Sequence, residues 1–143
     1  MSVIVEQVAR KLGGRSVLGS TVRSQADLAT VVRRRLPLAA LDGLELAGVD
    51  DREIERLVIP ARTRRHRAVK NEPLTVEESD RVVRLLRIQT LAEEVFGRDK
   101  AAKWLRRPLA ELDRESPLDL SRTEAGARLI ETILAKIAWG AAA

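Results

Sequence analysis

Several residue types are absent or rare in this chain of 143 residues. It has no cysteine and no tyrosine, one histidine at His66, and its only aromatic residues are Phe96, Trp104 and Trp139. Without cysteine there can be no disulfide, zinc finger, iron–sulfur cluster or thiol nucleophile. So few aromatic residues also argue against an RNA-binding sheet that stacks bases on aromatic side chains. The lack of cysteine is compatible with a reducing compartment.

Long apolar runs are also missing. No run reaches the length of about 18 residues that a membrane-spanning helix needs. The opening stretch MSVIVEQVARKLGG contains Glu6 and has no leading basic region, so it does not match a secretory signal. We therefore expect a protein of the cytoplasm that has no membrane partner.

Charge is plentiful but unevenly placed. The chain has 26 basic and 21 acidic residues, and its basic residues are mostly arginine. Residues 1–73 hold 14 basic and 9 acidic residues, whereas residues 74–143 hold 12 of each. Residues 52–70 alone carry seven cations against Glu53 and Glu55. A local excess of this kind is typical of a protein that binds a polyanion. Two other interpretations stay open, namely a genome rich in arginine and an arginine-rich helix that docks on an acidic protein.

The spacing of the apolar residues predicts an all-α fold. Helix starts are indicated by the capping signals at Ser24, Asp50 and Thr75, and Pro37 is expected to open a further helix. Asp50 begins a very short helix that Ile59-Pro60 ends, and the next helix is predicted from about residue 61 to residue 70. Two short helices joined by a tight break, the second strongly cationic, are typical of a helix-turn-helix.

The break at Asn71-Glu72-Pro73 predicts a domain boundary. We expect an N-terminal extension over residues 1–23, a helix-turn-helix domain over 24–72 and a small helical domain over 73–143. A long helix from the Thr75 cap to Gly97 is predicted, with ion pairs Glu77–Arg81 and Asp80–Arg84 along it. The last helix is expected from about residue 123 to residue 139, with Gly140 as its end. Its predicted inward face consists of Ala125, Leu129, Ile130, Ile133, Leu134 and Ile137.

No group of residues supports catalysis. His66 lies among arginines, and neither a nucleophile nor an orienting acid stands at a recognisable spacing from it. There is no calcium loop, and Gly13-Gly14 lacks the spacing and the preceding strand of a phosphate-binding loop. We therefore expect no enzymatic activity, no cofactor and no metal site.

The basic helix carries the strongest chemical signal. Its candidate DNA-binding residues are Arg62, Thr63, Arg64, Arg65 and Arg67, which cannot all face the core of so short a helix. Arginine and threonine near a helix N-terminus suit phosphate contacts, and arginine can also read a guanine edge through two hydrogen bonds. If about five phosphates are neutralised, the affinity should fall with salt with a log–log slope of about −4 to −5.

Several blocks of the sequence resemble a known family. PLTVEESDRVVRLLRIQTLAEEVFG, AAKWL, SPLDL and TEAGARLIETILAKIAWG resemble the C-terminal domain of Xre/MbcA/ParS-type antitoxins, and VVRRRLPLAALDGL with DREIERLVIPARTRRHR resembles the Xre helix-turn-helix domain that precedes it. This resemblance implies an antitoxin of a type II toxin–antitoxin system. Such an antitoxin is a homodimer that binds a RES-domain toxin, which degrades NAD, and blocks the toxin's active site with its C-terminal end. Within a higher-order complex it also represses its own operon by binding operator DNA.

The resemblance also assigns roles to residues. The helix after Ile59-Pro60 matches the recognition helix of the family, which implies that Arg62, Thr63, Arg65 and Arg67 face DNA. The terminal block implies that the toxin is bound by Ile137, Ala138, Trp139 and Gly140. Where this chain has Arg64 the family more often has an apolar residue, commonly leucine. An arginine there can snorkel, add a phosphate contact or loosen the domain. A stand-alone helix-turn-helix regulator without a toxin and an orphan scaffold protein are the alternatives.

Overall fold

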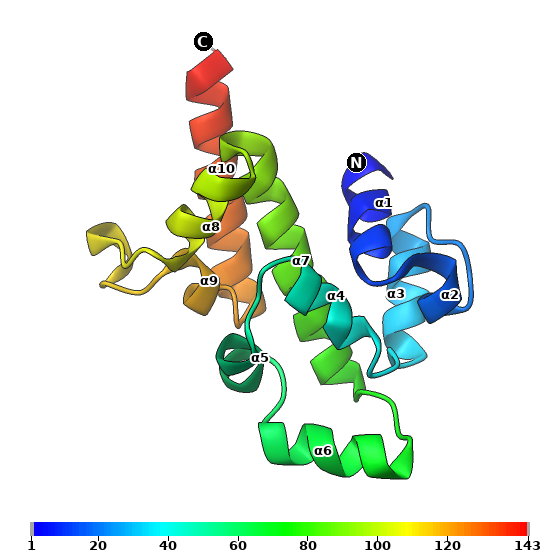
Figure 1. Ribbon diagram of the computed structural model, residues 1–143. Helices are drawn as coiled ribbons and strands as arrows, with labels where there is room; N and C mark the ends of the chain where they lie inside the picture. Colours follow the sequence, from blue (N-terminus) through cyan, green and yellow to red (C-terminus); the bar gives the residue numbers. More distant parts are fainter. Residues whose placement is uncertain (1, 143) are drawn as a thin grey trace. The chain divides into compact units, whose positions relative to one another are not determined.

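The computed structural model describes residues 2–142. Helices and turns make up this range, and it contains no strand, which confirms the predicted all-α fold. In chain order the elements are α1 (Ser2–Lys11), α2 (Gly14–Leu18), α3 (Gln25–Arg33), α4 (Ala40–Leu46), α5 (Asp51–Leu57), α6 (Ala61–Lys70), α7 (Val76–Phe96), α8 (Arg98–Arg106), the 3-10 turn η1 (Ala110–Leu112), α9 (Pro117–Leu120) and α10 (Glu124–Ala142) (Figure 1).

The chain divides into two compact units, Met1–Leu86 and Arg87–Ala143, which part inside the long helix α7. Residues 73–86, which we expected in the second domain, are joined to the first unit by specific contacts. The backbone N–H of Leu74 donates to the carbonyl of Leu36 at 2.9 Å, and the N–H of Leu36 donates to the Ser79 hydroxyl at 2.9 Å. The predicted functional boundary after residue 72 stays a prediction.

Residues 2–23, the N-terminal extension, are folded onto the first unit. α1 packs against α3 and α4 and buries Val5, Val8 and Ala9, and Leu12, which follows α1, continues this buried stripe. The end of α1 and the start of α4 approach each other so closely that only glycine fits at residue 43. A Cβ atom at Gly43 would lie 1.9 Å from the carbonyl oxygen of Lys11. The extension is therefore part of the core of this unit.

This close approach predicts a large effect of one methyl group. Gly43→Ala should lower the free energy of unfolding by about 1–3 kcal/mol, because the backbone of α1 has to move away from α4. Denaturant unfolding of the whole chain measures the effect. Gly140→Ala is the control, since Gly140 is also helical but has open space around the added Cβ. Equal stability of Gly43→Ala and wild type would contradict the contact.

The predicted helix starts are largely confirmed. The side chains of Ser24, Asp50 and Thr75 accept hydrogen bonds from the backbone N–H groups three residues later. Gly97, with φ of 81°, follows the last residue of α7 as predicted. Two boundaries were wrong. Residues 37–39 form a turn that precedes α4, whereas Pro37 was expected to open the helix, and α10 continues through Gly140, because a glycine within a helix costs only about 1 kcal/mol.

In the second unit, α10 is rotated relative to the expected orientation. Its fully covered side chains are Ala127, Ile130 and Leu134, whereas Ala125 and Leu129 are exposed and Ile133 and Ile137 are half-buried. The prediction is confirmed for Ile130 and Leu134 and wrong for Ala125 and Leu129. Apolar residues occupy more than half of the circumference of α10, so that spacing alone does not decide which side is covered. Arg87, from the second half of α7, joins α10 through an ion pair with Glu131 at 2.7 Å.

Candidate functional site

The pair α5 and α6 has the form of the predicted helix-turn-helix. α5 begins with a reciprocal capping box between Asp50 and Glu53, and it buries Ile54 and Leu57. Directly after α5 the chain turns, with Ile59 buried and its N–H donating to the carbonyl of Ile54 at 3.0 Å. Pro60 then precedes α6, which occupies the predicted residues 61–70. The buried Ile59 thus fixes the point from which the basic helix projects.

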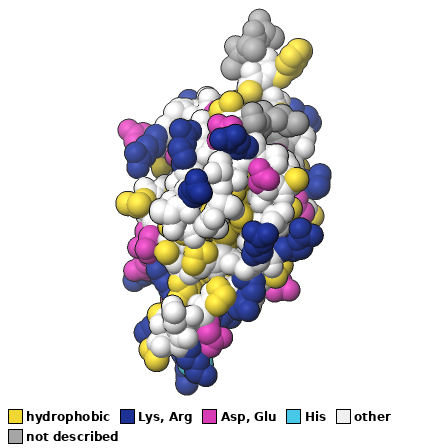
Figure 2. All heavy atoms as spheres, turned by 90° about the vertical axis from the view of Figure 1, so that its right-hand side faces the viewer, with side chains coloured by type: hydrophobic (Ala, Val, Ile, Leu, Met, Phe, Trp, Pro, Cys, Tyr) yellow, Lys and Arg dark blue, Asp and Glu magenta, His cyan; other side chains and the backbone are white. Residues whose placement is uncertain are grey.

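The candidate DNA-binding residues of α6 fall into two groups. Arg62 and Arg65 are exposed, and neither side chain has a hydrogen-bond or ion-pair partner among the described residues, whereas Thr63, Arg64 and Arg67 are half-buried. His66 is also exposed. Figure 2 shows basic side chains over the whole of one face, some of them at its lower end, where Figure 1 places α6. Arg62 and Arg65 are therefore the members of the set that are available to a phosphate.

Arg64 points back to the body of the first unit. Its guanidinium donates to the Glu45 carboxylate of α4 at 2.8 Å and lies 3.8 Å from the Asp51 carboxylate of α5. About a quarter of the Arg64 side chain stays exposed (28%). Snorkelling, a phosphate contact and a loosened domain were the roles expected for this arginine. None of them fully describes its position, because the guanidinium forms ion pairs within the protein.

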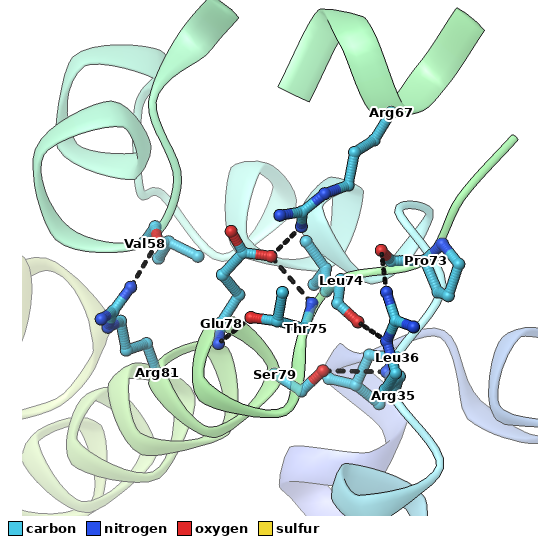
Figure 3. A network of polar contacts seen from close by, with 10 residues as sticks. All are labelled: Arg35, Leu36, Val58, Arg67, Pro73, Leu74, Thr75, Glu78, Ser79 and Arg81. Carbon is cyan, nitrogen blue, oxygen red and sulfur yellow. Dashed lines mark hydrogen bonds and ion pairs between the residues drawn. The ribbon is translucent and has the colours of Figure 1, made fainter. Parts of the chain in front are cut away.

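Arg67 forms an ion pair with Glu78 in the first turn of α7 (Figure 3). Glu78 also accepts a hydrogen bond from the backbone N–H of Thr75 at 2.8 Å, so the acid of the α7 capping box is shared with α6. Burial raises the pKa of the Glu78 carboxyl, but the hydrogen bonds from Arg67 and Thr75 together with the Arg67 charge outweigh it and hold that pKa below its usual value. Glu78 is therefore ionised at neutral pH and binds Arg67 as a carboxylate.

Two further arginines lie around the start of α7. Figure 3 shows Arg35, which follows α3, donating to the backbone carbonyls of Leu74 and Pro73, and Arg81 of α7 donating to the carbonyl of Val58 at the end of α5. The expected partner of Arg81 was Glu77. The guanidinium instead binds a carbonyl that α5 leaves without a helical partner. Part of the arginine excess in the first unit thus holds its helices together.

The Arg67–Glu78 pair predicts a pH dependence of stability. Because the pKa of Glu78 is lowered in the folded chain, the pair contributes fully above the ordinary glutamate value of about 4.3, and its contribution is lost as the pH falls through the folded-state pKa. The free energy of unfolding should therefore be higher for wild type than for Glu78→Gln at neutral pH, and the two values should converge in acid. The comparison removes the parallel contribution of Asp27, whose pKa is also lowered, by a backbone hydrogen bond from Arg23. A constant difference at all pH values would contradict the ion pair.

The predicted toxin-binding residues lie together on the last turns of α10. Ile137 is half-buried, Ala138 and Gly140 are exposed, and the Trp139 side chain is 80% exposed. Trp139 follows Leu134 by five positions, so at about 100° per residue it projects away from the side that Leu134 buries. A tryptophan exposed in this way has no role in the core of its own unit. By contrast, Trp104 is half-buried and contacts Phe96 with ring centroids 5.2 Å apart.

Within the described residues, no three histidine, aspartate or glutamate side chains converge where they could hold a metal ion. None of the helices in this part of the chain combines the length and the hydrophobicity that crossing a bilayer requires. The sites that the sequence predicted are the basic helix α6 and the end of α10, and the structure describes both.

Two family models match the chain. The model of the antitoxin Xre-like helix-turn-helix domain matches residues 27–87, and that of the antitoxin Xre/MbcA/ParS C-terminal toxin-binding domain matches residues 91–140. An Xre antitoxin of Yersinia enterocolitica is 33% identical over 104 residues, which cover 70% of each chain. The chain belongs to the Xre/MbcA/ParS-type antitoxin family.

Other members of the family show how far the likeness extends. An Xre antitoxin of Pseudomonas putida is 39% identical over 84 residues, 58% of this chain and 53% of the relative, and one of Photorhabdus laumondii is 30% identical over 101 residues, 69% of this chain and 62% of the relative. This chain thus spans about half of the length of the first of these two relatives. α1 and α2 precede the match to the helix-turn-helix model.

Three acidic residues of this site were missed in the sequence. Glu45, Asp51 and Glu78 form ion pairs with α6, but none of them was a candidate functional residue. Glu78 was predicted only as part of the α7 cap. One signal was available: a helix as cationic as residues 61–70 has no apolar side to pack, so acidic partners on neighbouring helices are a natural way to hold it.

Proposed function

We propose that this chain is an antitoxin that binds and neutralises a RES-domain toxin, an enzyme that degrades NAD, and that it acts by binding and not by catalysis. The observation that carries the proposal is the exposed Trp139 at the end of a unit matched by the toxin-binding family model. A large aromatic side chain exposed on a helix is typical of the central contacts of a protein interface. The C-terminal end of α10, from Ile137 to Gly140, blocks the active site of the toxin in this proposal.

The second part of the proposal is autorepression in the cytoplasm. As a homodimer, and in a higher-order complex with the toxin, the chain binds operator DNA through α6. Support comes from the match to the helix-turn-helix model and from the exposed, unpaired side chains of Arg62 and Arg65. Such side chains can contact phosphates or guanine edges without first breaking an ion pair within the protein.

Co-expression with the RES-domain protein of the neighbouring reading frame tests the first part. Growth arrest and loss of NAD caused by that protein should disappear when this chain is abundant, and the two proteins should purify as one complex. Persistent arrest and NAD loss in the presence of the abundant chain would refute neutralisation. Binding of the chain to its own promoter fragment tests the second part independently.

The alternative is a stand-alone helix-turn-helix regulator. The match to the helix-turn-helix model would be the same in such a protein, but an exposed Trp139 would have no use. This alternative predicts tight, sequence-specific binding of promoter DNA by the isolated chain and no stable complex with the RES-domain protein.

A further inference from the structure

The basic helix α6 lacks the usual means of attachment to its domain. None of its residues is buried, and its largest apolar side chain, Val69, is 88% exposed. The remaining apolar residues, Ala61 and Ala68, offer little surface. Burial of apolar area therefore contributes little to holding this helix at a defined angle.

Ion pairs of two arginines replace the missing apolar contacts. Arg64 reaches Glu45 on α4 and approaches Asp51 on α5, and Arg67 reaches Glu78 on α7. The side chains of the Arg67–Glu78 pair are largely covered, with exposed fractions of 15% and 10%. A pair that is partly shielded from water is stronger than one on the surface, and losing one partner leaves a charge without compensation. The two arginines stand three positions apart, so both attach the same side of α6.

We propose that Glu45 and Glu78 are positioning residues for DNA binding, which hold α6 in place through Arg64 and Arg67. This inference rests on the proposed DNA-binding function. It assigns the four candidate arginines of α6 to two different tasks. Arg62 and Arg65 contact DNA, whereas Arg64 and Arg67 fix the helix that presents them.

The proposal makes a prediction opposite to that of simple electrostatics. Removing an acid from a DNA-binding unit raises its net positive charge and should strengthen DNA binding. If Glu78 positions α6, its removal should weaken DNA binding instead. Glu78→Gln is a conservative test, because a glutamine at this place in the capping box can still accept the N–H of Thr75.

The experiment measures the affinity of the full-length chain for its promoter fragment at fixed salt. We expect Glu78→Gln to weaken binding about 10-fold and Glu45→Gln about 3-fold. Glu55→Gln is the matched control, since Glu55 is an exposed acid of α5 with no partner among the described residues, and it should bind as well as wild type or slightly better. Stronger binding by Glu78→Gln would overturn the proposal.

A double-mutant cycle and a structural measurement separate positioning from direct contact. If Arg67 acts through Glu78, Arg67→Gln and the double variant should bind DNA equally weakly, whereas fully additive effects would overturn the proposal. Hydrogen exchange without DNA should show that Glu78→Gln loses protection in α6 but not in α1, and unchanged protection in α6 would also overturn it. If wild type fails to bind the promoter, the proposed function fails, and the exchange measurement still tests how α6 is held.

Discussion

Trp139→Ala is expected to weaken binding to the RES-domain toxin about 30-fold to 1,000-fold, which corresponds to the loss of about 2–4 kcal/mol at a central interface residue. The side chain is 80% exposed in the free chain, so its removal leaves no cavity in the second unit. Trp139 lies more than one turn after the core residues of α10, which are Ala127, Ile130 and Leu134. Any loss of affinity therefore reflects the interface and not the fold.

Two measurements test this prediction. The dissociation constant of the purified complex gives the loss of affinity, and growth of cells that co-express the toxin gives the loss of neutralisation. Lys136→Ala is the matched control, because Lys136 is exposed on α10 one turn before Trp139, and it should change the affinity less than about 3-fold. Deleting residues 138–143 should abolish rescue and leave DNA binding unchanged. Full rescue by the truncated chain would remove Trp139 and Gly140 from the toxin-binding site.

The local features of the fold could be predicted from the sequence because they depend on neighbours in the chain. A cap needs only a side chain and an N–H group three residues away, as at Ser24 and Thr75. The ion pair between Asp80 and Arg84, four positions apart on α7, is of the same kind and was also predicted. By contrast, the orientation of α10 depends on which of its apolar residues meet other parts of the second unit, such as α9, and these lie elsewhere in the sequence.

The candidate DNA-binding site shows the same division. The position of α6 and the exposure of Arg62 and Arg65 follow from the tight break at Ile59-Pro60 and from an excess of charge that no core could accept. The roles of Arg64 and Arg67 could not be read in this way. Their partners Glu45 and Glu78 stand 19 and 11 residues away, and only the folded chain brings them together. Arg64 occupies a place where the family more often has an apolar residue. Here an ion pair with Glu45, in place of apolar packing, connects α6 to α4.

Replacing both Arg62 and Arg65 with alanine is expected to cause the largest loss of DNA affinity. The double variant removes two exposed cations that have no partner among the described residues, so no ion pair has to be broken before they contact DNA. Each phosphate contact contributes about 0.9 to the slope of log affinity against log salt concentration. The slope should therefore become less steep by about 2 for one chain and by about 4 for the proposed dimer. At low salt the affinity should fall at least about 30-fold for each chain, since each good arginine contact contributes about 1–3 kcal/mol.

Titration of the promoter fragment over a range of salt concentrations measures both quantities. Arg10→Ala/Arg15→Ala is the matched control, because it removes the same charge from exposed arginines that lie before the region matched by the helix-turn-helix model. If α6 contacts DNA, the control should keep most of the affinity and of the salt slope. Equal losses of affinity in the two double variants would mean that DNA binding depends only on the total charge of the first unit. This result would contradict a recognition surface on α6. Toxin neutralisation should be the same in both, since neither variant changes the second unit.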